Sequence, residues 1–442
     1  MERIAKAGIA CPVPFRVQPA SWISHLGAPY GANATEASDT VLRVDKANGG
    51  DGVNFARVVT FLPGKVLVEC AGKAPAVPGS GALRRVGAAV ACVGAALHRD
   101  SNHCSSGNGD DSARSDGSEG AGSIALVYAP WNPAAAKRHL AWDLGNALTC
   151  ERDLGFVDNL TRRELVQKWL RRFSRALQQD DNRPRVGAAG SHAGDEVDDE
   201  FAGLLAGLPE QIIHGDLNDY NILLTDEAAL SSDDVEEITT AGTADCAASP
   251  DTSAVVAQRL CSGVSVLDFG DMVWSKRIYD LAIAVAYASQ RRAAANDALS
   301  AALDVVHGYA TAQRALYPTP CNSNGSSTNN GAHEDSLSTR GGGKLSQAEA
   351  LALPVCVAAR LCQSVLTSAS TLAEIHASAI ESVDSQGDGT TTDERVSAKK
   401  AELESRAAYV ALSAAPGWAL LQQWDELHDS GRLGVLVQAL VE

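Results

Sequence analysis

Two short segments decide the fold: residues 214–224 (HGDLNDYNILL) and residues 264–270 (VSVLDFG). Each joins a polar loop to a short run of aliphatic residues. Asp216 and Asn221 lie five positions apart in the first segment, and Asp268 follows the aliphatic run of the second. A loop flanked by strands can place a base and a metal ligand side by side at this spacing. The two segments therefore predict one site built from three oxygen-bearing side chains.

The aliphatic runs at 222–224 and 264–267 predict two strands that pair as a hairpin. Residues 225–262 are then a hairpin connection enlarged by a long polar insertion, where a tight turn would suffice. Similar stretches rich in Gly, Ser, Asp, Asn and Thr interrupt the chain elsewhere. They carry too few large apolar residues to fold by themselves, and we interpret them as loop insertions in a smaller core. They lie at about 101–123, 181–200, 226–258, 319–344 and 384–397.

Between these insertions, apolar residues recur mainly at helical spacing. Leu83, Val86, Val90, Val93 and Leu97 predict one amphipathic helix, because they share a face at intervals of three and four residues. Further helices are expected from about 161 to 177, at 278–288, at about 346–378 and at about 395–441. Strands are expected at 57–62 and 212–213.

The predicted helix after residue 160 has two features of its own. Thr161 and Glu164 have the spacing of a capping box at its start. Four arginines are expected on its solvated face rather than in a binding site: Arg162, Arg163, Arg171 and Arg172.

Composition limits the classes of function. The chain has 442 residues, 45% of them hydrophobic, which is enough for a substantial core. A formal net charge of -17 argues against a nucleic-acid partner, since a phosphate backbone is bound through Lys and Arg patches. The ten cysteines form no CxxC pair, so reduced thiols in a cytoplasmic protein are expected. Neither a secretory signal nor a membrane span is expected, and the oligomeric state stays open.

The chemistry expected of the two segments is phosphoryl transfer, which depends on positioning and charge compensation more than on covalent help. Asp216 is the candidate base for the hydroxyl of an acceptor. Asn221 and Asp268 are the candidate Mg²⁺ ligands, because hard cations prefer oxygen. Two of these residues also have a structural alternative: Asp216 could be a turn-forming Asp, and the Asn221 amide could tie the loop together.

Four neighbouring residues are expected to have other roles. His214 is expected to brace the loop rather than to shuttle protons. Asp280 either caps the helix that follows it or supports the loop from below. Asp219 and Asp271 are either loop surface charges or partners for a cationic acceptor.

The strings HGDLNDYNIL and LDFGDM resemble the aminoglycoside phosphotransferase and choline kinase-like superfamily, and within it the hydroxylysine kinases. Residues 57–64 (RVVTFLPG) are similar to the family segment that links two lobes and borders the nucleotide base. Residues 360–364 (RLCQS) and 417–423 (GWALLQQ) resemble its C-terminal helices.

The resemblance implies an α+β, protein kinase-like fold with a mainly helical C-lobe at 65–442. It also implies transfer of the γ-phosphoryl of GTP, or of ATP, to the hydroxyl of 5-hydroxy-L-lysine. Asp216 is then the base, Asn221 and Asp268 hold Mg²⁺, and Arg360 is a candidate substrate contact. The base pocket is expected at Thr60, Phe61 and Leu62.

The chain departs from the family pattern at its start. Residues 4–9 (IAKAGI) resemble the end of a helix that follows the nucleotide-covering loop and the phosphate-binding Lys in the family. Residues 1–64 are therefore expected to be the remnant of an N-lobe truncated at its start, together with the interlobe linker. Two alternatives remain: a kinase for another amino alcohol or an aminoglycoside, and a catalytically impaired, pseudokinase-like binding module.

Overall fold

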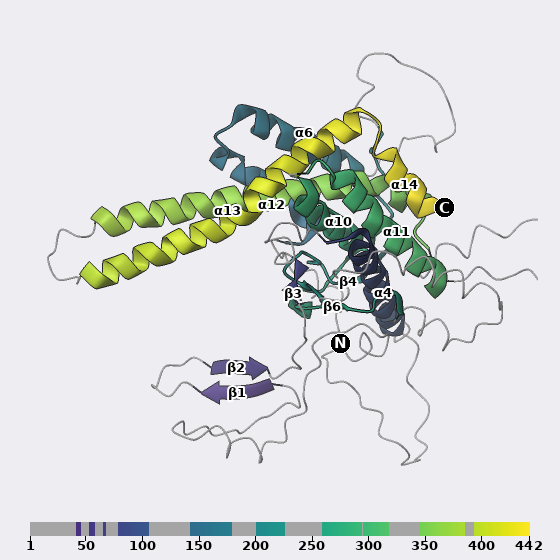
Figure 1. The fold of residues 1–442 in the computed structure, drawn as a ribbon, viewed down its shortest axis with the longest axis horizontal. Helices are drawn as coiled ribbons and strands as arrows, with labels where there is room; N and C mark the ends of the chain where they lie inside the picture. The colour runs from purple at the N-terminus through teal and green to yellow at the C-terminus, as the bar shows by residue number, and fades with distance from the viewer. Residues whose placement is uncertain are drawn as a thin grey trace, which may run out of the picture.

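The computed structural model is mostly helical with small antiparallel sheets, as the α+β prediction has it (Figure 1). It describes residues 41–45, 53–57, 65–67, 78–105, 142–178, 200–225, 259–293, 295–317, 344–384 and 393–442. The five predicted insertions fall largely outside these ranges, as do residues 58–64. Residues 101–105 and 393–397 are exceptions, since they belong to helices rather than to the insertions expected there.

Three small sheets are present in the described part of the chain, and all their pairings are antiparallel. β5 (Ile222–Leu224) pairs with β6 (Val264–Val266), which confirms the predicted hairpin, and β3 (Lys65–Val66) adds to the other edge of β5. β4 (Glu210–Ile213) pairs with β7 (Val273–Lys276), a strand that the sequence did not predict. The third sheet is β1 (Val41–Asp45) with β2 (Val53–Arg57). β2 ends at Arg57, which is the first residue of the strand expected at 57–62.

The helices lie around the β3–β5–β6 and β4–β7 sheets. They are α4 (Ser80–Ser105), the 3-10 helix η1 (Leu144–Phe156), α6 (Leu160–Leu177), α10 (Ile278–Ala293), α11 (Ala298–Leu316), α12 (Gln347–Asp384), α13 (Asp393–Asp429) and α14 (Gly434–Val441). α4 contacts both β4 and β6. α11 was not predicted. The single helix expected to reach residue 441 is two helices, because Gly431 adopts a left-handed backbone with φ of 71° between them.

The start and one face of α6 also differ from expectation. Asn159 is the N-cap residue, and its side chain accepts a hydrogen bond from the amide of Arg162 at 3.0 Å. Thr161 lies inside the helix, so the predicted capping box is wrong. Arg172 is 3% exposed and lies over the ring of Trp169, so the prediction of a solvated side chain fails for this arginine.

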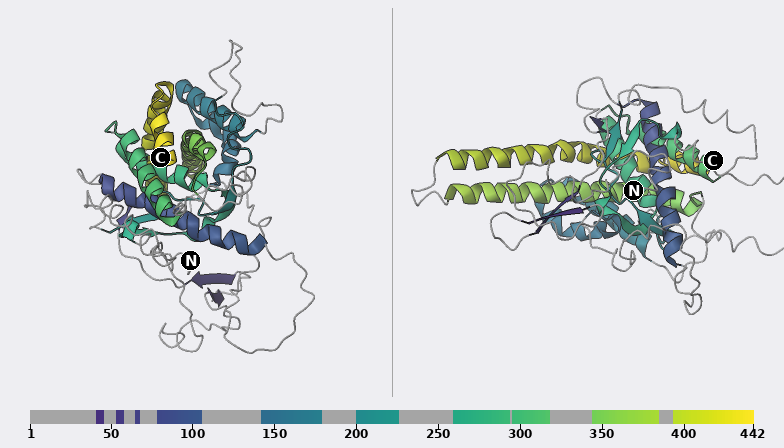
Figure 2. Two further views of the ribbon diagram at one scale, coloured as in Figure 1. Left: turned by 90° about the vertical axis from the view of Figure 1, so that its right-hand side faces the viewer. Right: turned by 90° about the horizontal axis from the view of Figure 1, so that it is seen from below.

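α12 forms the centre of the core and packs against η1, α6, α10, α13 and α14. Stretches within α4 and α12 are long and apolar enough to cross a membrane by length and composition alone. In the structure 78% and 89% of these two stretches is buried, which is the pattern of core helices. Figure 1 and Figure 2 show the C-terminal part of α12 and the N-terminal part of α13 running side by side, away from the other helices.

α4 and α11 approach each other through two glycines. A Cβ atom added to Gly87 would lie 1.8 Å from the carbonyl oxygen of Val305. A Cβ atom added to Gly308 would lie 1.8 Å from the carbonyl oxygen of Arg84. Each helix therefore places a glycine against the backbone of the other, and this close crossing fixes α4 over the core.

Candidate active site

The loop after β4 is held by one buried carboxylate. Asp280, in the first turn of α10, is 2% exposed. Its Oδ2 accepts from the amide of His214 and its Oδ1 from the amide of Gly215, both at 2.9 Å. Gly215 has φ of 82°, a conformation that glycine adopts without strain. Of the two roles left open for Asp280, the structure shows the support of the loop.

Burial raises the pKa of Asp280, and the two amide hydrogen bonds and the nearby His214 oppose this effect. A carboxylate removed from water needs donors on both oxygens, and the loop backbone supplies them. The helix α10 and the loop are therefore locked together, which fixes the position of the next residue, Asp216.

His214 joins this loop to the one after β6. Its Nε2 lies 2.7 Å from the carbonyl oxygen of Leu267, and its Nδ1 lies 3.3 Å from the amide nitrogen of Asp216. Nε2 therefore carries the proton and donates to the carbonyl, while Nδ1 accepts from the amide. The ring of Phe269 contacts the imidazole edge-on, with centroids 4.8 Å apart. Both nitrogens are used for bracing, as expected of this residue.

The carboxylate of Asp216 receives three side-chain hydrogen bonds. Arg360 donates to Oδ1 at 2.6 Å, while Asn218 and Asn221 donate to Oδ2 at 2.7 and 3.1 Å. The side chain remains 14% exposed. A carboxylate has about four acceptor positions, so about one remains open for a further donor. The geometry fixes this carboxylate and still leaves it able to accept a proton.

Asn221 and Asp268 are brought together by the β5–β6 pairing. The amide of Leu267, next to Asp268, donates to the carbonyl oxygen of Asn221 at 2.8 Å. The side-chain nitrogen of Asn221 donates to the backbone carbonyl and the carboxylate of Asp216. Both amide hydrogens of Asn221 are then used, which leaves its side-chain oxygen as the group available to a cation.

Asp268 has an exposed side chain and a left-handed backbone, with φ of 50°. Its Oδ1 accepts a hydrogen bond from the amide of Gly270 at 3.2 Å. No group of three or more His, Cys, Asp or Glu residues in the described part of the chain is placed to hold a metal. A carboxylate and an amide oxygen nevertheless fit Mg²⁺, which usually takes one or two protein ligands and completes its shell with waters and phosphates.

Asp219 is buried beside the same loop and is 1% exposed. Its Oδ2 accepts from Arg291 of α10, with 2.7 Å to the Nε atom and a second bond to Nη2. Burial raises the pKa of Asp219, and the charge of Arg291 opposes this effect. The cation that pairs with Asp219 in this structure is thus a side chain of the protein, which the sequence analysis did not foresee.

Arg360 of α12 is 1% exposed and lies between two aromatic rings. Its guanidinium carbon is 5.6 Å from the ring centre of Trp142 and 5.4 Å from that of Tyr287. Nη1 donates to the carbonyl oxygen of Trp142 at 2.7 Å and to Gln363 at 3.0 Å. Burial lowers the pKa of Arg360, but interactions with Tyr287 and Asp216 outweigh it, so the net shift is upward.

The remaining predicted site residues cannot be placed in the same way. Thr60, Phe61 and Leu62 lie outside the described residues. Asp271 ends the short 3-10 turn Phe269–Asp271, and its backbone is described but its side chain is not. The structure therefore joins Asp216, Asn221, Asp268, Asp219 and Arg360 around one loop system.

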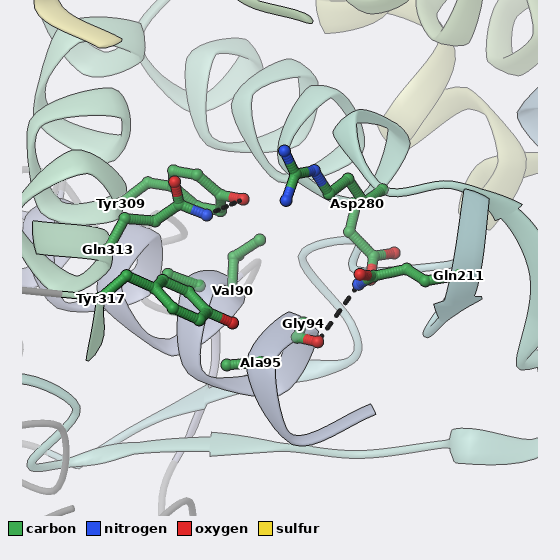
Figure 3. A pocket seen from close by; sticks show the side chains of 10 residues that line it. Val90, Gly94, Ala95, Gln211, Asp280, Tyr309, Gln313 and Tyr317 are labelled. Carbon is green, nitrogen blue, oxygen red and sulfur yellow. Dashed lines mark hydrogen bonds between the residues drawn. The ribbon is translucent and has the colours of Figure 1, made fainter. Parts of the chain in front are cut away.

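A small cavity lies behind this loop, between α4, β4 and α11 (Figure 3). Asp280 lines it together with Gln211, whose side chain donates to the carbonyl of Gly94 at 3.1 Å, and Tyr309, whose hydroxyl accepts from Gln313 at 3.0 Å. Its volume of about 10 Å³ is near the minimum that a cavity needs to hold one water molecule. It is too small for a nucleotide or an amino alcohol.

Sequence reasoning missed three contributors to the site: Asn218, Arg291 and Trp142. Asn218 had a readable signal, because an Asn two residues after an Asp in a loop commonly makes local hydrogen bonds. Arg291 and Trp142 reach the site through tertiary packing, and local sequence carries no sign of it. In comparisons with protein-family models, with curated proteins and with solved structures, no match to this chain was found.

Proposed function

We propose that this chain is a small-molecule kinase with a kinase-like catalytic site, transferring the γ-phosphoryl group of GTP or ATP to the hydroxyl of 5-hydroxy-L-lysine. The observation that carries the proposal is the joining of Asp216, Asn221 and Asp268 by two braced loops. The Leu267–Asn221 hydrogen bond and the two bonds to Asp280 hold these loops. The choice of acceptor and of GTP rests on the resemblance of residues 214–223 and 267–272 to the hydroxylysine kinases.

In the proposed reaction Asp216 accepts, or orients, the proton of the acceptor hydroxyl. Its fixed carboxylate with about one open acceptor position suits this role, since an oriented base avoids the entropic cost of alignment. Asn221 and Asp268 would hold Mg²⁺, and the ion would supply compensation for the negative charge of the phosphates. The base of the nucleotide is proposed to lie against residues 60–62, in a kinase-like arrangement of two lobes.

The acceptor is an amino alcohol, so its ammonium group needs a carboxylate. Asp219 and Asp271 were the two candidates, and Asp219 is already paired with Arg291. We therefore assign this part to Asp271 for testing. Asp271→Ala should raise the KM for the amine substrate much more than the KM for the nucleotide, and equal effects would exclude the assignment.

The proposal is tested with the full chain, Mg²⁺, labelled GTP or ATP, and a panel of acceptors: 5-hydroxylysine, choline, ethanolamine and an aminoglycoside. Transfer to 5-hydroxylysine should exceed transfer to the others and should be lost in Asp216→Ala. Asp158→Ala, which removes an exposed carboxylate after η1, serves as the matched control and should keep the activity.

Three outcomes would redirect the proposal. Preference for another acceptor would keep the phosphotransferase and change its substrate. Binding of nucleotide or amine without transfer to any acceptor would favour the pseudokinase-like binding module. Turnover that survives Asp216→Ala would remove Asp216 as the base.

A further inference from the structure

The contact between Arg360 and Asp216 suggests a role beyond that of a substrate contact. Arg360 is 144 positions away in the sequence, on the central helix α12, yet it makes the shortest hydrogen bond to the Asp216 carboxylate. At 1% exposure its guanidinium is closed off by the rings of Trp142 and Tyr287 and cannot reach a ligand in solvent. What it touches of the site is the proposed base.

We propose that Arg360 is a positioning residue for Asp216: it fixes the carboxylate through Oδ1 while Asn218 and Asn221 fix Oδ2. This inference rests on the proposed function. A carboxylate held on only one oxygen can rotate about its Cβ–Cγ bond, whereas one held on both cannot. Arg360 itself is held by Trp142 and Gln363 on Nη1, so the direction of its Nη2 is set before any substrate binds.

The alternative is that Arg360 only fills the core beneath the loop. The two roles predict different effects of substituting Arg360 with methionine and with lysine. Methionine preserves much of the volume and removes the charge, while lysine preserves the charge and one bond but not the planar fork. A filling role predicts that methionine is at least as good as lysine in every assay. A positioning role predicts that lysine is better for catalysis even if methionine is better for stability.

The chain offers a matched control in Arg172. It is also a buried arginine, 3% exposed, that stacks on a tryptophan and pairs with an aspartate, Asp425, at 3.8 Å. It lies on α6 and makes no contact with Asp216 that the structure records. Arg172→Met therefore shows what the loss of a buried, stacked arginine does to folding and activity in general.

The first measurement is steady-state phosphoryl transfer at a temperature where each variant is folded. Arg360→Met should lower kcat by about 100-fold, the effect typical of a misplaced catalytic group, with the KM for nucleotide unchanged. Arg360→Lys should recover about 10-fold of this loss. Arg172→Met should retain kcat. The inference is overturned if Arg360→Met turns over at the wild-type rate, or if kcat in the three variants simply follows their melting temperatures.

The second measurement does not need activity. Asp216→Asn should lower the Tm of the wild-type chain, because it leaves the buried Arg360 without its anionic partner, and it should change the Tm of Arg360→Met much less. Equal shifts in both backgrounds would mean that the two side chains do not interact, which overturns the inference. If the wild-type chain transfers phosphate to no acceptor, the proposed function fails, and this cycle still decides whether Arg360 fixes Asp216.

Discussion

The Oδ1 atom of Asp280 lies 2.9 Å from the amide nitrogen of Gly215, a residue 65 positions earlier in the chain. This bond and its neighbour to His214 attach the candidate catalytic loop to the start of α10. The start of the loop is therefore attached to the helical core, in addition to the bonds that join it to Leu267 after β6.

Removing this carboxylate should release the loop. Asp280→Ala leaves two buried amides without acceptors, at about 1–3 kcal/mol each, so the free energy of unfolding should fall by about 2–6 kcal/mol. Hydrogen exchange should accelerate at the amides of His214 and Gly215. Asp297→Ala, which removes an exposed partner of Arg292 just before α11, should cost less than about 1 kcal/mol. Protected amides in Asp280→Ala would contradict the bracing role.

The metal ligands can be tested by binding alone. Asp268→Asn keeps a residue that tolerates the left-handed backbone but removes the charge, and Asn221→Ala removes the amide oxygen. Each should weaken the affinity for a Mg²⁺ complex of a non-hydrolysable nucleotide by at least about 10-fold, measured by titration calorimetry. Asp158→Asn is the control for loss of one carboxylate. If affinity is unchanged in both site variants, these residues do not hold the cation.

The close crossing of α4 and α11 predicts an unusually large effect for a small change. Gly87→Ala and Gly308→Ala each place a methyl group against backbone that cannot move aside, so the unfolding free energy should fall by more than about 3 kcal/mol despite the better helix propensity of alanine. A Cβ added to Gly155 in η1 meets nothing within 4 Å, so Gly155→Ala should be nearly neutral. Denaturant unfolding gives the unfolding free energies of the three variants. Similar values for all three would contradict the close approach of α4 and α11.

Asp143, the N-cap of η1, should make stability depend on pH. Burial raises its pKa, although hydrogen bonds from the Gly145 amide and the Ser275 hydroxyl oppose the shift. The folded state therefore holds this proton at pH values where the unfolded state has lost it, so the contribution of Asp143 to stability falls as pH rises above about 4. Asp143→Asn keeps a side chain that can cap the helix, but this side chain does not titrate.

The unfolding free energy of Asp143→Asn relative to wild type should thus increase with pH across that window and then level off. Denaturant melts at a series of pH values measure it. A flat difference, or one that increases toward acid, would show that the pKa is not raised in the folded protein.

The sequence predicted the parts of the fold that depend on local pattern. The β5–β6 pairing follows from two aliphatic runs, and α4, α10 and α12 follow from helical spacing. α11 was missed although Ala301, Val305 and Ala312 line its buried face, because small alanines give a weak apolar signal. β7 was missed because its four residues become a strand only by pairing with β4.

The same distinction holds for the candidate site: contacts within one loop could be predicted from the sequence, and contacts between distant segments could not. The offset of Asn221 from Asp216 was correct evidence that the two would meet, since a short loop allows few arrangements. The partner of Asp219, Arg291, is 72 positions away, and the bond from Arg360 to Asp216 crosses most of the C-terminal half. Such pairs are set by how helices pack, which no local spacing records.

The β5–β6 ladder closes with a bond from the amide of Thr225 to the carbonyl of Gly263 at 3.0 Å, on the side of the strands away from Asn221 and Leu267. The chain leaves β5 and returns to β6 at this hydrogen bond. We therefore expect this bond and the Leu267–Asn221 bond, rather than the length of the connection at 226–258, to set the distance between the two ligand-bearing loops. A cassette inserted or exchanged there should leave the catalytic geometry intact, which makes this position a natural attachment point for a label or a tethered partner.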